Sequence, residues 1–267
     1  MQGRRLAVAI HHHKGKGVSV RNPPKMSFSE MNSDGWVSRL KADFLSGGAI
    51  IVTQTPANED GAAVLLLSRM IGKPMWTTVP RRPGNADCLE DIVHRIEAVN
   101  TPAVSKMGLP VLSTTASEFG CHTDESYLSE PAEAIALHCI RQASTGGGTI
   151  LADVRDLVGT LRVCDAEALR GDFPHRSGSA CILSGSNDSP AIRYNPYEFS
   201  RGKGEVLSTR QRCAMAALDE AIGACAIVIR LDPGDCLILD NRRILHGRTS
   251  FDPSDGRLFL RVRLRIS

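Results

Sequence analysis

The sequence predicts a single domain that is mainly β-sheet, with helices packed on its outside. The chain has 267 residues, 42% of them apolar, which is enough to build one extensive core. Short apolar runs of strand length recur along the chain and are bounded by turn residues. The segment 257–266 alternates strictly between two kinds of side chain, as a strand with two different faces does. We therefore expect one domain over residues 1–267.

The C-terminal segment 257–266 carries an unusual row of positively charged side chains. Leucine, valine and isoleucine occupy one face, whereas the other face carries Phe259 and the arginines at 257, 261, 263 and 265. Taken alone, this pattern predicts a solvated edge strand, because arginine is seldom buried without a partner. If the strand lies inside the domain, its arginines need anionic partners there.

The other elements follow from periodicity and turn residues. Helical spacing of apolar residues predicts helices over 27–45, 59–71 and 209–224, and shorter ones over 87–99 and 153–161. Apolar runs predict strands over 49–53, 134–140, 226–231 and 236–239, and one beginning at Thr149 after glycines 146–148. Residues 73–118 are expected to form loops around the mouth of a site. The segment 162–208 has the weakest periodicity, so its secondary structure is the hardest to predict.

Two histidines and one carboxylate form a candidate metal site. His122 and Asp124 stand two residues apart, so in a strand their side chains share a face. Together with His246 they make the set that holds Fe(II) in non-haem oxygenases while leaving positions open for other ligands. Glu125 is a weaker candidate because it points to the opposite face of such a strand. His138 lies within an apolar run and is expected to be a packed core residue.

Composition excludes several classes of protein. The net charge of +3 points to no polyanionic partner, and the low aromatic content of 4% argues against a nucleic-acid stacking surface. The eight cysteines show no Cys-x-x-Cys pair, and residues 6–10 are too short for a leader or a membrane span. We expect a cytoplasmic enzyme with reduced thiols and no membrane partner. Histidines 11–13 are expected to be a flexible surface tract rather than a metal site.

Four blocks of the sequence resemble one known family, the Fe(II)/2-oxoglutarate dioxygenases of the taurine dioxygenase and clavaminate synthase branch, which includes amino-acid hydroxylases. The blocks run from Phe119 to Tyr127, from Gly146 to Thr149, from Pro233 to Thr249, and from Arg257 to Arg261. They span more than half of the chain. The resemblance implies a double-stranded β-helix, a cupin-like jelly roll, with Fe(II) between its two sheets and 2-oxoglutarate and O2 as cosubstrates.

The resemblance also implies roles for individual residues. His122, Asp124 and His246 would hold the iron. Arg257, whose forked guanidinium matches a carboxylate, would bind the far end of 2-oxoglutarate with help from Thr149. Thr149 could otherwise be a plain strand residue.

Three further residues are candidates for substrate binding. Arg261, on the same strand face as Arg257, would bind the anionic group of a small-molecule substrate such as an amino acid; its alternative is an ion pair with a structural acid. Asp172 falls where relatives often carry a polar residue that touches substrate, although the Gly171-Asp172 pair departs from the family pattern. Arg193 lies in a segment that resembles the strand and turn beside the pocket in the family, and its alternative is an exposed position or a structural ion pair.

Other activities remain open at this point. Hydroxylation, desaturation, epimerisation and ring closure share one set of iron ligands, and a jelly-roll binding protein without turnover is a further alternative. A zinc hydrolase using the same three ligands is disfavoured, because its reaction would not need Arg257 or Thr149. Halogenation is disfavoured because related halogenases replace the carboxylate ligand, and Asp124 is present. The sequence predicts neither the substrate nor the oligomeric state.

Overall fold

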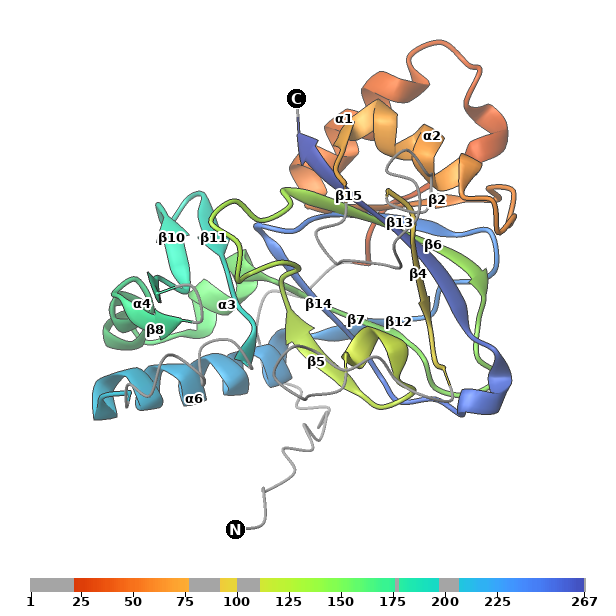
Figure 1. Ribbon diagram of the computed structural model, residues 1–267. Helices are drawn as coiled ribbons and strands as arrows, with labels where there is room; N and C mark the ends of the chain where they lie inside the picture. The colour runs from red at the N-terminus through yellow and green to blue at the C-terminus, as the bar shows by residue number, and fades with distance from the viewer. Residues whose placement is uncertain (1–21, 77–91, 100–110, 176–177, 197–206, 267) are drawn as a thin grey trace.

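Two β-sheets face each other and form the centre of the molecule (Figure 1). The computed structural model describes residues 22–76, 92–99, 111–175, 178–196 and 207–266. Within these ranges the larger sheet has seven strands and the smaller one has four. This architecture agrees with the predicted jelly roll. The histidines at 11–13 and the apolar run 6–10 lie outside the described residues.

The larger sheet follows the order β1-β2-β13-β6-β15-β3, with β4 also pairing with β15. Its strands are β1 (Lys25–Ser27), β2 (Ala49–Thr53), β3 (Gly72–Pro74), β4 (His94–Glu97), β6 (Ala134–Arg141), β13 (Cys236–Asp240) and β15 (Leu258–Ile266). The smaller sheet follows the order β12-β7-β14-β5. Its strands are β5 (Phe119–His122), β7 (Thr149–Asp153), β12 (Ile227–Ile229) and β14 (Ile244–Arg248).

Three apolar cores hold the layers together, one between the sheets and one behind each sheet. Residues such as Leu137, Leu151 and Phe259 fill the space between the sheets. The helices α1 (Trp36–Gly47) and α2 (Ala62–Ile71) contribute to the core behind the larger sheet. The helices α3 (Val154–Thr160), α4 (Val163–Leu169) and α6 (Thr209–Cys225) contribute to the core behind the smaller sheet (Figure 1). The central strands are therefore covered on both faces.

The remaining elements are short. Two small hairpins pair β8 (Phe173–His175) with β9 (Gly178–Ala180), and β10 (Leu183–Gly185) with β11 (Pro190–Ile192). The 3-10 helices in the described residues are η1 (Phe28–Glu30), η3 (Leu112–Thr114) and η4 (Pro253–Asp255). In the described ranges, no helix combines the length and the apolar character that crossing a bilayer requires.

The last strand, β15, is not a solvated edge, contrary to what its pattern predicts when taken alone. It pairs with β6 on one side and with β3 and β4 on the other. Its arginines at 257, 261 and 263 are 5–8% exposed, and Arg265, near the end of the strand, pairs with Glu130 at the surface. The row of arginines therefore faces the interior, where its partners form part of the candidate site.

Helix ends were the least accurate part of the prediction. The helix predicted over 27–45 begins at Trp36, because Ser27 belongs to β1 and Gly35 adopts a left-handed conformation with φ of 75°. The helix predicted over 59–71 begins at Ala62, directly after another left-handed glycine, Gly61. A helix over 87–99 is wrong for the described part, since His94–Glu97 forms β4 against β15. The helix over 209–224 and the strands over 49–53, 134–140 and 236–239 are confirmed.

Candidate metal centre

The pairing of β5 with β14 brings two histidines together. His122 and His246 are direct partners in this antiparallel pair, and their ring centroids lie 4.5 Å apart. The strands approach closely at Gly247, where an added Cβ would lie 2.6 Å from the carbonyl oxygen of Phe119. A larger residue there would push β5 away from β14. The absence of a side chain at Gly247 therefore helps to hold the two imidazoles close together.

Asp124 completes the cluster from the turn that follows β5. The strand ends at His122, so Asp124 reaches the site from outside the strand and not from its next inward position. Its Oδ1 lies 3.5 Å from Nε2 of His122 and 3.7 Å from Nε2 of His246. The three ligand atoms all lie within 4.8 Å of one another, and all three residues are buried. One ion could touch all three atoms.

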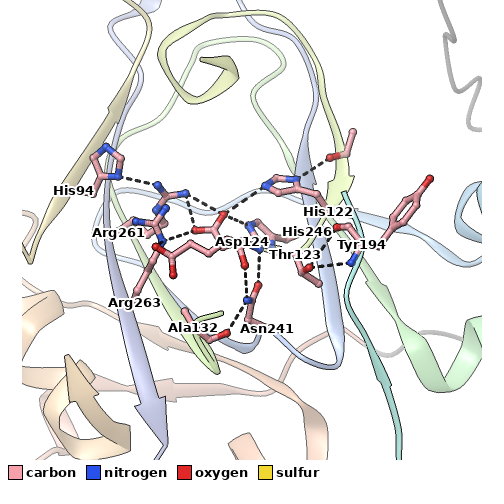
Figure 2. Close-up of polar contacts among 12 residues, drawn as sticks. His94, His122, Thr123, Asp124, Ala132, Tyr194, Asn241, His246, Arg261 and Arg263 are labelled. Atoms are coloured by element: carbon pink, nitrogen blue, oxygen red, sulfur yellow. Dashed lines mark hydrogen bonds and ion pairs between the residues drawn. The ribbon is translucent and has the colours of Figure 1, made fainter. Parts of the chain in front are cut away.

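The main chain of Asp124 is clamped by Asn241, as Figure 2 shows. The Asn241 amide group accepts from Asp124 N–H at 2.8 Å and donates to the carbonyl oxygens of Asp124 and Ala132. At the preceding residue, the N–H of Thr123 donates to the Tyr194 carbonyl oxygen. The turn is therefore fixed from two directions before any ion binds.

The second oxygen of Asp124 is held by two arginines of β15 (Figure 2). Arg263 Nε lies 3.0 Å from Oδ2, and Arg261 Nη1 lies 2.8 Å from Oδ2 and also donates to Oδ1 at 3.2 Å. Oδ1 is the oxygen that also faces the histidines. Burial alone would raise the pKa of Asp124, but the two guanidinium groups hold that pKa well below its usual range. The carboxylate is therefore ionised and oriented for a cation.

The histidines are also in the form that a metal needs. The Nδ1–H of His122 donates to the Gly120 carbonyl oxygen at 2.9 Å, which leaves the lone pair of Nε2 facing the cluster. Burial, together with the neighbouring His122, lowers the pKa of His246 to about 4, so this ring is neutral at physiological pH. Two imidazoles and one carboxylate fit Fe(II) with three open positions. Glu125 is outside the cluster and lies 3.4 Å from Arg263.

A small cavity of about 50 Å³ adjoins the cluster on the side of its two histidines. Its lining includes both histidines, Thr149, Arg257 and Arg261. Arg257 is 5% exposed, stacks its guanidinium 3.9 Å from the centre of the Phe259 ring, and donates from Nε to Gln142 Oε1 and Gly147 O. These recorded partners are neutral. Burial, and then the nearby Arg248, lowers the pKa of Arg257 to about 9.

The glycine turn before Thr149 packs directly against Arg257. Gly147 has φ of 65°, and an added Cβ would lie 3.0 Å from Cδ and Nε of Arg257. A residue with a side chain would thus be strained and would press on the guanidinium. The glycine therefore lets the turn pack against Arg257, and the strand that follows places Thr149 in the same cavity.

The family follows from a comparison with known proteins. Residues 17–263 match the model of the taurine catabolism dioxygenase TauD, TfdA family. The chain belongs to the TauD/TfdA family. Among solved structures, this family member resembles asparagine oxygenase bound to Fe(II), hydroxyasparagine and succinate, with a TM-score of 0.65 and 22% identity over 85% of this chain and 77% of that one. It also resembles the oxygenase OrfP bound to Fe, succinate and (3S)-hydroxy-L-Arg, with a TM-score of 0.66 and 19% identity over 86% and 81%.

Relatives found by sequence comparison match this chain over only part of their own length. The L-asparagine oxygenase of Streptomyces coelicolor is 29% identical over 49% of this chain and 42% of its own. The L-lysine 3-hydroxylase of Catenulispora acidiphila is 27% identical over 52% and 42%, and the trimethyllysine dioxygenase of Gallus gallus is 26% identical over 49% and 37%. The aligned part of the TauD/TfdA chain thus spans about two fifths of each of these relatives.

The predicted residues divide into two groups in this TauD/TfdA structure. His122, Asp124, His246, Thr149, Arg257 and Arg261 surround the cavity or the ligand cluster. Arg193 and Asp172 do not line that cavity. Arg193 donates to the carbonyl oxygens of Ser126 and Leu128, so it supports the loop after Asp124. Asp172 is exposed, borders a separate depression beside the start of α6, and accepts from Gln211 through its carbonyl oxygen.

The expectation for His138 is confirmed. It is fully buried in β6, and its Nε2 lies 2.7 Å from the hydroxyl of Thr55. Because that hydroxyl also donates to the Gly234 carbonyl oxygen, Nε2 of His138 carries the proton and donates to Thr55. Burial lowers the pKa of His138 to about 4. The residue is a neutral core histidine of the larger sheet.

Several site residues were missed by sequence reasoning. Asn241, His94, Arg248 and Arg263 all contact the site, yet none belongs to a recognised ligand pattern. His94 accepts a hydrogen bond from Arg261 at 2.7 Å (Figure 2). The strict alternation of β15 could have indicated Arg263, since it shares a face with Arg257 and Arg261. The sequence gives no comparable signal for Asn241.

Replacing Asn241 by alanine should weaken metal binding while leaving the three ligand side chains in place. The clamp fixes the main chain of Asp124, so its loss lets Oδ1 move away from the histidines. We expect about a tenfold weaker Kd for Fe(II), in the range found for residues that orient ligands. Anaerobic titration with Fe(II) measures this, and Asn187→Ala, which contacts Arg170 at the surface, is the control. An unchanged Kd would contradict a positioning role for Asn241.

Proposed function

We propose that this protein is an Fe(II)- and 2-oxoglutarate-dependent oxygenase that hydroxylates a free amino acid or a similar small metabolite with a carboxylate. One observation carries this proposal: the buried His122–Asp124–His246 cluster shares a cavity with a buried guanidinium, Arg257, whose recorded partners are neutral. A metal hydrolase would have no use for that cation. A keto-diacid that binds iron at one end needs a cation at the other.

The overall reaction balances as substrate R–H, 2-oxoglutarate and O2 giving R–OH, succinate and CO2. An iron that changes valence would carry electrons from 2-oxoglutarate and the substrate to O2, which acid–base groups cannot do. His122 and His246 would hold the ion through Nε2, and Asp124 would hold it through Oδ1. Arg261 and Arg263 contact Oδ2, which would leave Oδ1 for the ion. A set of two imidazoles and one carboxylate would leave positions open for the cosubstrates.

Arg257 and Thr149 bind the far carboxylate of 2-oxoglutarate in this proposal. The Nε of Arg257 is already committed to Gln142 and Gly147, which fixes the plane of the guanidinium. Within the described residues its hydrogen bonds all come from Nε, so the two terminal nitrogens are available for a bidentate contact. A buried cation of this kind is stabilised when its ligand arrives.

The substrate class rests on Arg261 and on the relatives. Arg261 lines the cavity next to the iron ligands, where it could receive the carboxylate of an amino acid. The similar proteins named above act on asparagine, arginine and lysine according to their names and bound molecules. A cytoplasmic location, consistent with described cysteines that are all free thiols, belongs to this proposal.

Two measurements test the activity itself. Under anaerobic conditions, Fe(II) and 2-oxoglutarate together should give a weak charge-transfer band in the visible range. A screen of amino acids and related acids should then reveal one that stimulates O2 consumption and succinate release, with a product 16 Da heavier by mass spectrometry. A product that has lost two hydrogens would indicate desaturation or ring closure. Failure to bind 2-oxoglutarate in the presence of Fe(II) would disprove the proposal.

Replacing Arg261 by alanine should raise the KM for the amino-acid substrate about tenfold or more, which is typical for losing one charge-assisted hydrogen bond. The KM for 2-oxoglutarate should change little. Arg263→Gln is the matched control, because Arg263 also contacts Asp124 but does not line the cavity. If both variants change both constants alike, Arg261 acts through Asp124 and does not bind substrate.

A further inference from the structure

A second arginine, Arg248, is buried in the cavity without an acidic partner. It is 6% exposed and lines the cavity together with Arg257. Its Nη2 donates to the carbonyl oxygens of Leu112, Thr115 and Ser117 at 3.4, 2.7 and 2.6 Å. Its Nε is buried and has no hydrogen-bond partner within the part of the chain that the structure describes. The recorded partners of Arg248 are therefore all neutral.

Arg248 and Arg257 lie at the same end of the cavity. On the smaller sheet, Arg248 is the direct partner of Thr149, the threonine proposed to contact 2-oxoglutarate. The guanidinium carbons of Arg248 and Arg257 lie 4.9 and 5.4 Å from the centre of the same Phe251 ring. The charge of Arg248 also lowers the pKa of Arg257, which agrees with their closeness. Two cations and one hydroxyl thus gather around one space.

This arrangement is costly unless an anion joins it. Burial removes the hydration of each cation, and the two positive charges repel each other. Burial also lowers the pKa of Arg248 to about 10. The carboxylate of Asp124 is already bound by Arg261 and Arg263. A ligand with a negative group at this end of the cavity would satisfy both guanidinium groups at once.

We propose that Arg248 is a second cationic contact for the far carboxylate of 2-oxoglutarate, shared with Arg257 and Thr149. This inference rests on the proposed function and adds a residue to it. Arg248 would make the site select a keto-diacid over a keto-monoacid of the same length. Through its three carbonyl contacts, it would also join the bound cosubstrate to the segment 112–117, whose Ser113 lines the cavity.

The test compares two ligands that differ at one end. 2-Oxopentanoate has a methyl group where 2-oxoglutarate has its far carboxylate, and both carry the same keto acid group. Binding of each to the Fe(II)-loaded protein is measured anaerobically by calorimetry. Arg248→Gln removes the charge but keeps a donor for the carbonyl oxygens of Thr115 and Ser117. In this variant, 2-oxoglutarate should bind about tenfold or more weakly, and 2-oxopentanoate should bind as in the wild type.

Arg248→Lys keeps a cation and should retain most of the preference for the diacid. The metal-free protein gives a second readout, because succinate should raise the melting temperature of the wild type more than butyrate, and this difference should shrink in Arg248→Gln. If Arg248→Gln weakens both keto acids equally, or neither, Arg248 is a structural tether and the inference is overturned. A wild type that binds 2-oxoglutarate no better than 2-oxopentanoate overturns the inference, and one that does not bind 2-oxoglutarate with Fe(II) overturns the proposed function as well.

Discussion

Replacing Asp124 by alanine should abolish succinate formation, because the variant loses its iron. Asp124 supplies the negative charge among the three clustered ligands, and its Oδ1 is the atom closest to both imidazoles. Removing residues that merely orient ligands weakens metal binding about 10- to 100-fold, so loss of a ligand should exceed about a hundredfold. Anaerobic Fe(II) titration gives the Kd, and succinate release gives the activity.

The same change leaves a charge problem in the protein interior. Arg261 and Arg263 would lose the carboxylate that both of them contact, and breaking a buried pair typically costs about 3–5 kcal/mol. The variant Asp124→Asn keeps an oxygen at the same place, so it separates loss of charge from loss of packing. Unfolding by urea should show both variants less stable than the wild type.

Glu125→Gln is the matched control for Asp124. Glu125 is the neighbouring carboxylate, is equally buried and contacts Arg263, but it lies outside the ligand cluster. It should therefore keep its iron. Wild-type turnover by Asp124→Ala, or loss of iron from Glu125→Gln but not from Asp124→Ala, would show that the wrong carboxylate has been assigned.

The ligand cluster could be predicted because its signal is local and chemical. Two histidines and a carboxylate are the residue types that the chemistry requires, and the Gly-Asp turn and strand before His246 indicate where the second histidine lies. Alternation along 257–266 placed the arginines on one face, and the structure has them there. The pattern could not predict which other strands pack beside this one and bury that face. Burial depends on β3, β4 and β6, which come from distant parts of the chain.

The supporting residues were harder to predict for the same reason. Asn241 holds Asp124 across 117 residues of sequence, and Arg248 contacts carbonyl oxygens that any residue could supply. The predicted first residues of two helices were wrong. The apolar spacing begins before Gly35 and Gly61, but each helix begins only after that glycine, which is in a left-handed conformation. The helix expected over 87–99 gave way to β4, since pairing with β15 outweighed local propensity.

Replacing Arg257 by alanine should weaken 2-oxoglutarate binding about a hundredfold or more while leaving iron binding intact. Arg257 is 5% exposed, so its contact with a carboxylate would form away from water, where truncating one partner of a buried charge pair costs about 2–5 kcal/mol. Arg257 is not among the three clustered ligands, so the Kd for Fe(II) should stay within about twofold. Anaerobic titration of the visible band with 2-oxoglutarate measures the loss.

Arg265→Ala provides the control on the same strand. Arg265 shares the alternating face with Arg257 but pairs with Glu130 near the surface, far along the strand from the cavity lining. It should bind 2-oxoglutarate like the wild type. Arg257→Lys should recover only part of the affinity, since an ammonium group cannot make the two parallel hydrogen bonds of a guanidinium. Added guanidinium ions should partly restore binding to Arg257→Ala, because they can enter the space that the side chain leaves.

The pattern of losses across these variants decides what Arg257 does. A residue that binds the far carboxylate should matter for 2-oxoglutarate and succinate but not for 2-oxopentanoate. A residue that only supports the glycine turn, through its contact with Gly147, should affect all three ligands alike. If Arg257→Ala binds the diacid as tightly as the wild type, the buried guanidinium has another ligand. The cavity would then have to be assigned to a different anion, because it would still hold two buried guanidinium groups whose hydrogen bonds go to neutral groups.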